Sequence, residues 1–368
     1  MSRFYYYLIL INMIANIIAS VPVILIQYRK NGVILSMILG IIVGLIIVYL
    51  ITNFFNSYPG KSLPDLLKAT MPKWFNIFFT FVLIGVWFFA GLITLITFTI
   101  LLIHFLAPEM THLMGTLLIV FFMAFGCFMK ADKVLYTVEI IFVLTLPMLL
   151  FIFFKAYTNE QMEWDYVKVA ITYINTMPRF LPFMSSVFLF LGVLNLVIFN
   201  QFFTTKQSIG WKQITFIGIL GTVVLFTTYF IPIGFNGFEN IESIMYPWVS
   251  TSDSMRIRYG FIERVVFVFL LFYLAISCIS LLIHWHVVVE LLKSIFNFNK
   301  LKIKNVKITP FIVIIAFITI TAITVILIDE LQIYYFTTYY YLHFAISVPS
   351  LLIVMWMIKR RLKNAKKT

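Results

Sequence analysis

Ten long apolar stretches, separated by short polar connections, constrain the fold of this chain more than any other feature. An α-helix needs about 20 predominantly apolar residues to cross the hydrocarbon core of a bilayer, and nearly all of these stretches reach or exceed that length. The pattern predicts an all-α integral membrane protein with ten transmembrane helices. The predicted spans cover residues 4–27, 33–55, 75–106, 113–129, 134–156, 180–203, 212–236, 259–291, 308–328 and 338–358.

The basic residues alternate along the connections between these spans. One alternate set of connections carries 19 of the 27 lysines and arginines, and the other set carries the remaining eight. Because basic residues accumulate on the cytoplasmic side of membrane helices, this alternation predicts that both termini are cytoplasmic. The basic-rich set consists of Arg3; Lys61, Lys68 and Lys73; Lys130 and Lys133; Lys206 and Lys212; Lys293, Lys300, Lys302, Lys304 and Lys307; and Lys359, Arg360, Arg361, Lys363, Lys366 and Lys367.

The composition supports one transmembrane domain over residues 1–368, with a basic cytoplasmic tail at 359–368. The chain is 62% hydrophobic and 11% charged, whereas a soluble domain is about 45–50% apolar and about 25% charged. Its net charge of +13 resides in the cytoplasmic connections, where it faces anionic lipid headgroups. No basic patch with interleaved aromatic residues is left over. We therefore expect the lipid bilayer, and no nucleic acid, as a partner.

No motif in the chain indicates catalysis. The five histidines show no spacing typical of a metal site, and Cys127 and Cys278 form no ligand cluster. No phosphate-binding loop or nucleophile elbow is present. We therefore predict no metal, no cofactor and no enzymatic activity. A membrane-embedded transferase stays open as an alternative, although no motif favours it.

Helix-breaking residues occur in the first span of each group of five. Span one holds Asn12, Asn16, Ser20 and Pro22, and span six holds Pro178, Pro182, Gly192 and Asn195. Two groups with an odd number of spans must be inverted relative to one another, which predicts repeats at about 4–156 and 178–358. Interrupted helices in corresponding positions of such repeats form a midplane binding site in transporters. Alternatively, these residues belong to ordinary bundle helices whose neighbours satisfy the backbone.

Several short motifs are similar to those of a known family. Span two is followed by Tyr58-Pro59-Gly60-Lys61-Ser62-Leu63-Pro64-Asp65-Leu66-Leu67, and Lys73-Trp74 opens span three. Ser62 is placed to cap a short helix over Leu63–Ala69. Span six contains Phe190-Leu191-Gly192, and span eight opens with Phe261-Ile262-Glu263-Arg264. In this order, the motifs resemble the B-subunit family of spore germinant receptors, a branch of the amino acid–polyamine–organocation transporter superfamily.

The resemblance implies a LeuT-like fold of two inverted five-helix repeats. It implies residence in the inner membrane of the dormant spore, and assembly with an A-type subunit and a lipoprotein C-type subunit. The implied role is to bind a small-molecule germinant of amino acid or nucleoside type and to trigger germination. Two other functions stay open: an ordinary secondary transporter of amino acids or amines, and a scaffold that anchors a complex without binding a ligand.

By the resemblance, the ligand lies at mid-membrane between spans one, three, six and eight. An unwound helix there exposes N–H and C=O groups that bind a polar ligand without charged side chains. Alternatively, the span-eight serines only allow close helix packing, and His284 is a satisfied bundle histidine that cannot share a face with His286. The pocket favours a modest, neutral or zwitterionic ligand. The predicted ligand-binding residues are Ala15, Asn16, Val86, Ala90, Leu191, Gly192, Ser277, Ser280 and His284.

A second group of residues is assigned structural or gating roles. Arg264 is expected to find its partner on another segment, which makes an architectural role preferable to ligand contact. The sequence also departs from the family, which usually carries glycines in span one, where Ala15 and Asn16 stand here. The family also often has a glutamate at the position of Leu194, next to Asn195. The structural and gating candidates are Pro22, Pro182, Asn195, Glu263 and Arg264.

Overall fold

We describe the protein from a computed structural model, which covers residues 2–16, 20–207, 209–257, 262–296, 298, 302–303 and 306–365. Phe261 of the span-eight motif and the tail residues Lys366 and Lys367 lie outside the described residues. The first half contains α1 (Arg3–Asn16), α2 (Ser20–Gln27), α3 (Val33–Asn56), α4 (Leu63–Thr70), α5 (Lys73–Leu106), α6 (His112–Gly126), α7 (Ala131–Tyr157) and α8 (Trp164–Thr172).

The second half begins with an interrupted helix made of α9 (Phe180–Phe188), the 3₁₀ segment η2 (Leu189–Asn195), α10 (Leu196–Phe199) and η3 (Asn200–Phe202). A short 3₁₀ turn, η1 (Tyr173–Asn175), precedes it. Later come α11 (Trp211–Asn236), η4 (Asn240–Ser243), α12 (Pro247–Ser254), α13 (Val265–Ile295), the antiparallel strands β1 (Lys302–Ile303) and β2 (Val306–Lys307), α14 (Thr309–Leu327) and α15 (Glu330–Ala365).

The helices confirm a multi-pass integral membrane protein. In the described part of the chain, eight helices are long and apolar enough to cross a bilayer. The pair α1 and α2, bent by 56° between Asn16 and Ser20, makes nine if its two parts form one span. The remaining predicted span corresponds to α6, which is apolar but only 15 residues long. That is shorter than the roughly 20 residues a straight crossing requires.

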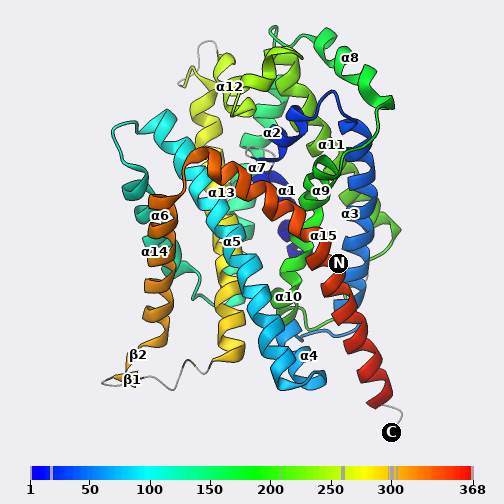
Figure 1. The fold of residues 1–368 in the computed structure, drawn as a ribbon, viewed down its shortest axis with the longest axis vertical. Coiled ribbons are helices and arrows are strands. Elements are labelled where there is room, and N and C mark those ends of the chain that lie inside the picture. Colours follow the sequence, from blue (N-terminus) through cyan, green and yellow to red (C-terminus); the bar gives the residue numbers. More distant parts are fainter. Residues whose placement is uncertain are drawn as a thin grey trace.

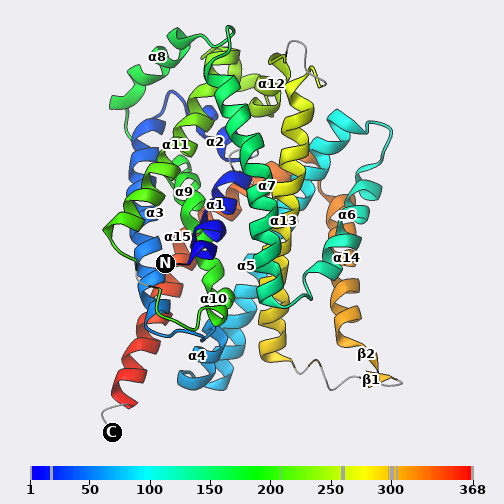
Figure 2. The same ribbon diagram turned by 180° about the vertical axis from the view of Figure 1, so that it is seen from behind.

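The surface helices mark the two ends of the molecule. Figures 1 and 2 show α4, the β1–β2 hairpin and the end of the chain at one end, which we call the α4 end. The helices α8 and α12 lie at the opposite end, which we call the α12 end. The long helices α5 and α13 run side by side between the two ends and make the most extensive helix contact, and α1 packs against η2. These packed helices surround the candidate site.

The motif at 58–67 forms the predicted local structure. Ser62 caps α4, because its hydroxyl accepts from the Asp65 amide at 3.4 Å while the Asp65 carboxylate accepts from the Ser62 amide at 3.1 Å. This reciprocal arrangement satisfies two donors that the first helical turn leaves unpaired. The helix extends to Thr70, one residue beyond the prediction. Arg361 of α15 donates to the Thr70 carbonyl at 2.6 Å, which joins α4 to the last helix.

Both helices that were predicted to be interrupted depart from regular α-helix. The first bends after Asn16, and the second tightens into the seven-residue 3₁₀ segment η2. The structure differs here from the expectation that Leu191 and Gly192 supply unwound backbone, since both lie within the 3₁₀ turn. A 3₁₀ segment inside a helix bonds each residue to a partner three positions away and often marks a hinge or a strained sequence.

Candidate functional site

Asn12 joins the two interrupted helices. Its side-chain amide nitrogen donates to the Phe188 carbonyl at 2.8 Å and to the Leu189 carbonyl at 3.2 Å. These carbonyls lie at the junction of α9 and η2, where the change in helical repeat alters the backbone hydrogen-bond ladder. Asn12 is 5% exposed, so both carbonyls accept these hydrogen bonds from a buried side chain. The side chain of α1 therefore stabilises the interruption in the second helix.

Gly192 allows the backbones of α1 and η2 to approach closely. A Cβ atom at this position would lie 2.4 Å from the Leu8 carbonyl oxygen and 2.9 Å from the Ile9 Cα. Both are backbone atoms, so the clash could be relieved only by moving a helix. The glycine of the span-six motif thus sets the spacing between the two interrupted helices.

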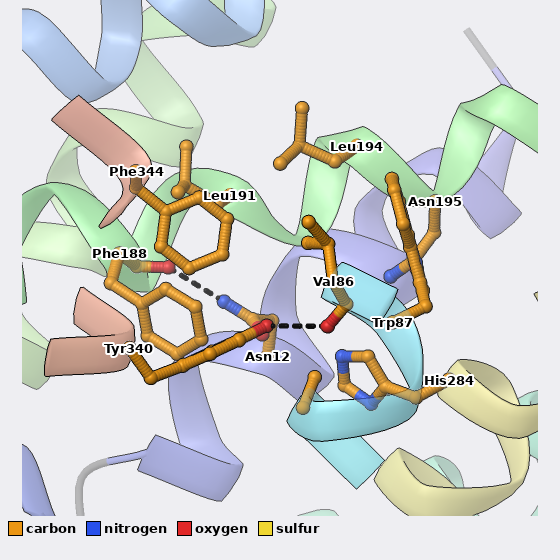
Figure 3. Close-up of a pocket in the computed structure, with 11 residues that line it drawn as sticks. Asn12, Val86, Trp87, Phe188, Leu191, Leu194, Asn195, His284, Tyr340 and Phe344 are labelled. Carbon is orange, nitrogen blue, oxygen red and sulfur yellow. Dashed lines mark hydrogen bonds between the residues drawn. The ribbon is translucent and has the colours of Figure 1, made fainter. Parts of the chain in front are cut away.

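A small cavity lies beside this junction (Figure 3). The space open to the centre of a water molecule is about 20 Å³, which is room for about one water. None of the described lining residues carries a formal charge at neutral pH when the histidine is neutral. The lining consists of Asn12, Val86, Trp87, Ala90, Phe188, Leu191, Leu194, Asn195, His284, Tyr340 and Phe344, which come from α1, α5, α9, η2, α13 and α15.

The polar atoms of the lining are held by specific hydrogen bonds. The Trp87 indole donates to the Asn195 side-chain oxygen at 2.7 Å, and the Tyr340 hydroxyl donates to the Val86 carbonyl at 3.0 Å. The Nδ1 atom of His284 lies 2.6 Å from the Ser280 carbonyl. A carbonyl oxygen only accepts, so Nδ1 carries the proton, and in the neutral ring Nε2 is an acceptor.

Aromatic rings form one wall of the cavity. The ring centroids of Phe188 and Phe344 are 5.2 Å apart, and those of Tyr340 and Phe344 are also 5.2 Å apart. Phe188 and Tyr340 contact edge to face at 6.0 Å. Figure 3 shows these three rings grouped on one side of Asn12, with Trp87 and His284 on the other side. The rings fill space that a ligand larger than water would need.

The structure brings about half of the predicted site together. Val86, Ala90, Leu191 and His284 line the cavity, and so does Asn195, which was assigned a structural role. Ala15, Asn16, Gly192, Ser277 and Ser280 are not among the lining residues. Asn16 instead donates to the Asn12 carbonyl at 2.7 Å, while Ser280 accepts from His284 through its own carbonyl. Ser277 is buried in α13.

Most of the structural candidates lie at helix starts. Pro22 and Pro182 each occupy the first turn of a helix, α2 and α9 respectively, where proline is tolerated because its missing N–H has no helical partner. Arg264 pairs with Asp253 of α12, with 3.0 Å between Nε and Oδ1. Arg264 thus has its partner on another segment, while its architectural role stays a prediction, and Glu263 beside it is exposed.

The two histidines of α13 face different surroundings, as their spacing predicts. His284 faces the cavity, whereas Nδ1 of His286 lies 3.0 Å from the Cys127 carbonyl at the end of α6. Among the described residues, no group of three or more His, Cys, Asp or Glu side chains is arranged to hold a metal ion.

Six lining residues were predicted neither as ligand contacts nor as structural candidates: Asn12, Trp87, Phe188, Leu194, Tyr340 and Phe344. Asn12 carried a signal, because it is one of the helix-breaking residues of span one. Tyr340 and Phe344 are four residues apart and share a face of α15. Their sequence context, a span rich in aromatic residues, does not distinguish a cavity wall from a lipid-facing belt.

At the α12 end, basic residues that follow α2 bind the loop around η4. Arg29, which follows α2 and is 3% exposed, donates to the Phe238 carbonyl at 2.6 Å and to the Glu242 carboxylate at 2.7 Å. Lys30 bonds the Glu239 carboxylate at 2.5 Å, and this contact lowers the pKa of Glu239 from its ordinary value. Burial, together with a hydrogen bond to Glu330, raises the pKa of Tyr246. The first half of the chain is thereby fastened to the loop around η4.

At the α4 end, Asn200 fastens the opposite side. Its side-chain nitrogen donates to the carbonyls of Tyr58 and Lys61 at 2.9 and 2.8 Å. The Gly60 amide donates to the Phe203 carbonyl at 2.7 Å. These bonds hold the loop before α4 against the end of the second interrupted helix.

These features define a multi-pass membrane protein in which two interrupted helices meet at a small, uncharged cavity lined by mostly buried residues. The chain belongs to the spore permease family of spore germination proteins, whose family profile matches residues 2–358. The match confirms the resemblance that the motifs indicated. None of the curated proteins compared with the chain matches it significantly.

Proposed function

We propose that this protein is the membrane-embedded subunit of a nutrient germinant receptor, and that it binds a small molecule of amino acid or nucleoside type in the cavity beside Asn12. The observation that carries the proposal is the cavity at the meeting point of α1 and η2, in a chain that belongs to the spore permease family. Ligand binding there triggers germination.

The proposed membrane arrangement has ten crossings, with α1 and α2 as one span and α6 as another. The two short surface helices support inverted repeats. Helix α4 follows the second helix of the first repeat and α12 follows the second helix of the other, and each has eight residues with a proline at its start. They lie at opposite ends of the molecule (Figure 1), as inversion requires. The long helices α5 and α13 come next in each repeat.

The positive-inside rule assigns the α4 end to the cytoplasm, because the basic connections and the tail belong to it. In this proposal both termini are cytoplasmic, and the protein resides in the spore inner membrane with A-type and C-type receptor subunits as partners. The α12 end, with its Arg29 and Lys30 contacts to the η4 loop, then faces outward.

The mechanism follows from the size of the cavity. With about 20 Å³ available, an amino acid enters only if the aromatic wall of Phe188, Tyr340 and Phe344 rearranges. A ligand shifts the balance between a closed and an open arrangement only by its difference in affinity for the two. The open arrangement, stabilised by the ligand, is what the partner subunits would detect.

The test compares two tryptophan substitutions on the same helix. Ala90→Trp places an indole in the cavity lining, whereas Gly85→Trp places it where a Cβ atom would have no described neighbour within 4 Å. Spores carrying Ala90→Trp are expected to lose the response to the cognate nutrient at normal protein level, while Gly85→Trp spores respond normally. A normal response of Ala90→Trp spores, or of spores lacking the chain, to every nutrient tested would overturn the proposal.

One observation also favours a second function, secondary transport. Interrupted helices that meet at mid-membrane are the arrangement by which transporters bind substrate and alternate access. Uptake of a labelled amino acid or amine into vesicles that contain this chain alone would establish transport. Binding without uptake would favour the receptor.

A further inference from the structure

The hydrogen bonds within the cavity determine which atoms are left to meet a ligand. Both amide hydrogens of Asn12 are used by the Phe188 and Leu189 carbonyls. Its oxygen accepts from the Asn16 side chain at 3.4 Å and, with two acceptor sites, has one left to offer. Nδ1 of His284 is used by the Ser280 carbonyl, so the neutral imidazole offers Nε2 as an acceptor. The imidazole lies near Asn12 and Tyr340 in Figure 3. Two acceptors thus face the same space.

The donors of the lining are mostly occupied. The Trp87 indole N–H is bonded to Asn195, and the Tyr340 hydroxyl is bonded to the Val86 carbonyl. Among the eleven lining residues, the side-chain nitrogen of Asn195 is the side-chain donor that these hydrogen bonds do not use. The described lining contains no lysine or arginine. A carboxylate brought here would find one neutral donor group and no cation, and an unpaired charge is costly at this depth.

The aromatic residues of the lining favour a cation rather than a carboxylate. Trp87, Phe188, Tyr340 and Phe344 surround the same space, and the face of each ring carries negative charge density. Several rings around one position attract an organic cation, most strongly where water is excluded. The acceptors and the ring faces favour a positively charged group, and the described lining contains no basic residue that would repel it.

We propose, building on the proposed function, that this pocket selects its ligand by an amino group. The group binds as an ammonium ion, donates to His284 Nε2 and Asn12 Oδ1, and lies against the aromatic rings. Within the proposed function, this narrows the ligand from amino acids and nucleosides in general to a small amine or amino acid derivative with a short apolar body and no carboxylate beside the amine. The bound ammonium ion favours the neutral form of His284, because two positive charges in the same space would repel each other.

Three probes of matched size test this selection on the purified full-length protein in detergent. n-Propylamine is a cation at pH 7, propionate is an anion and 1-propanol is neutral. The expected result is a concentration-dependent rise in the thermal transition with n-propylamine that exceeds the rise with either other probe. Ala90→Trp is expected to remove the effect, which places binding in the cavity.

Two leucine substitutions separate recognition by the rings from general packing. Phe344→Leu removes a ring from the cavity wall and is expected to weaken n-propylamine binding by about 2- to 30-fold. Phe317→Leu is the matched control, because Phe317 is an equally buried ring that packs on Phe88 and Trp285 outside the lining. His284→Leu should weaken n-propylamine binding more than any 1-propanol binding, because a hydrogen bond from an ammonium ion is stronger than one from a neutral hydroxyl.

The outcomes distinguish this inference from the proposed function. If propionate or the neutral nucleoside adenosine raises the transition more than n-propylamine does, and Ala90→Trp removes that rise, ligand binding stands and amine selection is refuted. If Phe344→Leu and Phe317→Leu weaken n-propylamine binding equally, the aromatic argument is refuted. If no probe binds and Ala90→Trp spores also germinate normally, both proposals are refuted.

Discussion

The contact between Asn12 and the α9–η2 junction gives the sharpest test of how the two interrupted helices are held together. Asn12→Leu keeps the size of the side chain and removes both bonds to the Phe188 and Leu189 carbonyls. Hydrogen bonds between membrane helices contribute about 0.6 kcal/mol each on average and at most about 1.7 kcal/mol. Losing two therefore lowers the free energy of unfolding by about 1 to 3 kcal/mol.

The matched control is Asn76→Leu in α5. Asn76 is similarly buried, at 9% exposure, but the hydrogen bond found for its side chain among the described residues is with Thr80 of its own helix and is long at 3.4 Å. The Thr80 hydroxyl keeps its bond to the Asn76 carbonyl at 2.7 Å after the substitution. We expect the control to change the free energy of unfolding by less than about 0.5 kcal/mol.

Reversible unfolding in mixed micelles of increasing SDS content, followed by tryptophan fluorescence, measures both variants. Asn12→Leu should also reduce the nutrient response of spores at normal protein level, because the lining is displaced along with the junction. Equal stability of the two variants would refute the reasoning, since it would show that the Phe188 and Leu189 carbonyls do not depend on α1.

Other contacts give further predictions. Gly44→Ala should destabilise the protein by about 1 to 3 kcal/mol, because the added Cβ would lie 2.5 Å from a ring atom of Phe190 in the second interrupted helix. Gly85→Ala, with open space around it, should be neutral in the same unfolding assay. Arg29→Gln should free the η4 loop, measured as greater mobility of a spin label within η4, at a cost of about 1 to 3 kcal/mol; unchanged mobility would contradict it. A separate prediction concerns the ion pair between Lys30 and Glu239. Lys30 lowers the pKa of Glu239, so this ion pair is fully present above the unfolded pKa of about 4.3. It is lost as the pH falls through the lower folded pKa, so the label should stay immobile at pH 5–7 and loosen only in stronger acid.

The parts of the site that the sequence predicted are those that depend on local spacing. Val86 and Ala90 were placed by counting from the start of α5, and a four-residue separation puts both on one helix face. His284 and His286 were expected to face apart for the same reason, and they do. The capped helix α4 was also predictable, because Ser62 and Asp65 satisfy each other within one turn.

The parts that were missed depend on contacts between distant segments. Nothing local to Tyr340 or Phe344 distinguishes a ring that faces a cavity from one that faces lipid, since both environments are apolar. The role of Gly192 was also misjudged for this reason. A glycine in an interrupted helix indicates either unwinding or close approach, and only the position of the Leu8 carbonyl shows that close approach is the reason here.

The polar contacts near the two ends of the molecule differ in chemistry, and this difference bears on how the cavity could open. At the α12 end, the contacts join charged side chains, Arg29 and Lys30, to partly exposed carboxylates. At the α4 end they join the neutral amide of Asn200 to backbone carbonyls. The Lys30–Glu239 pair is exposed on both sides, so water and salt screen it and it contributes little. Arg29 is instead buried and also bonds the Phe238 carbonyl, as Asn200 bonds carbonyls at the other end. Opening toward the α12 end therefore depends on breaking the contacts of Arg29, and opening toward the α4 end on breaking those of Asn200.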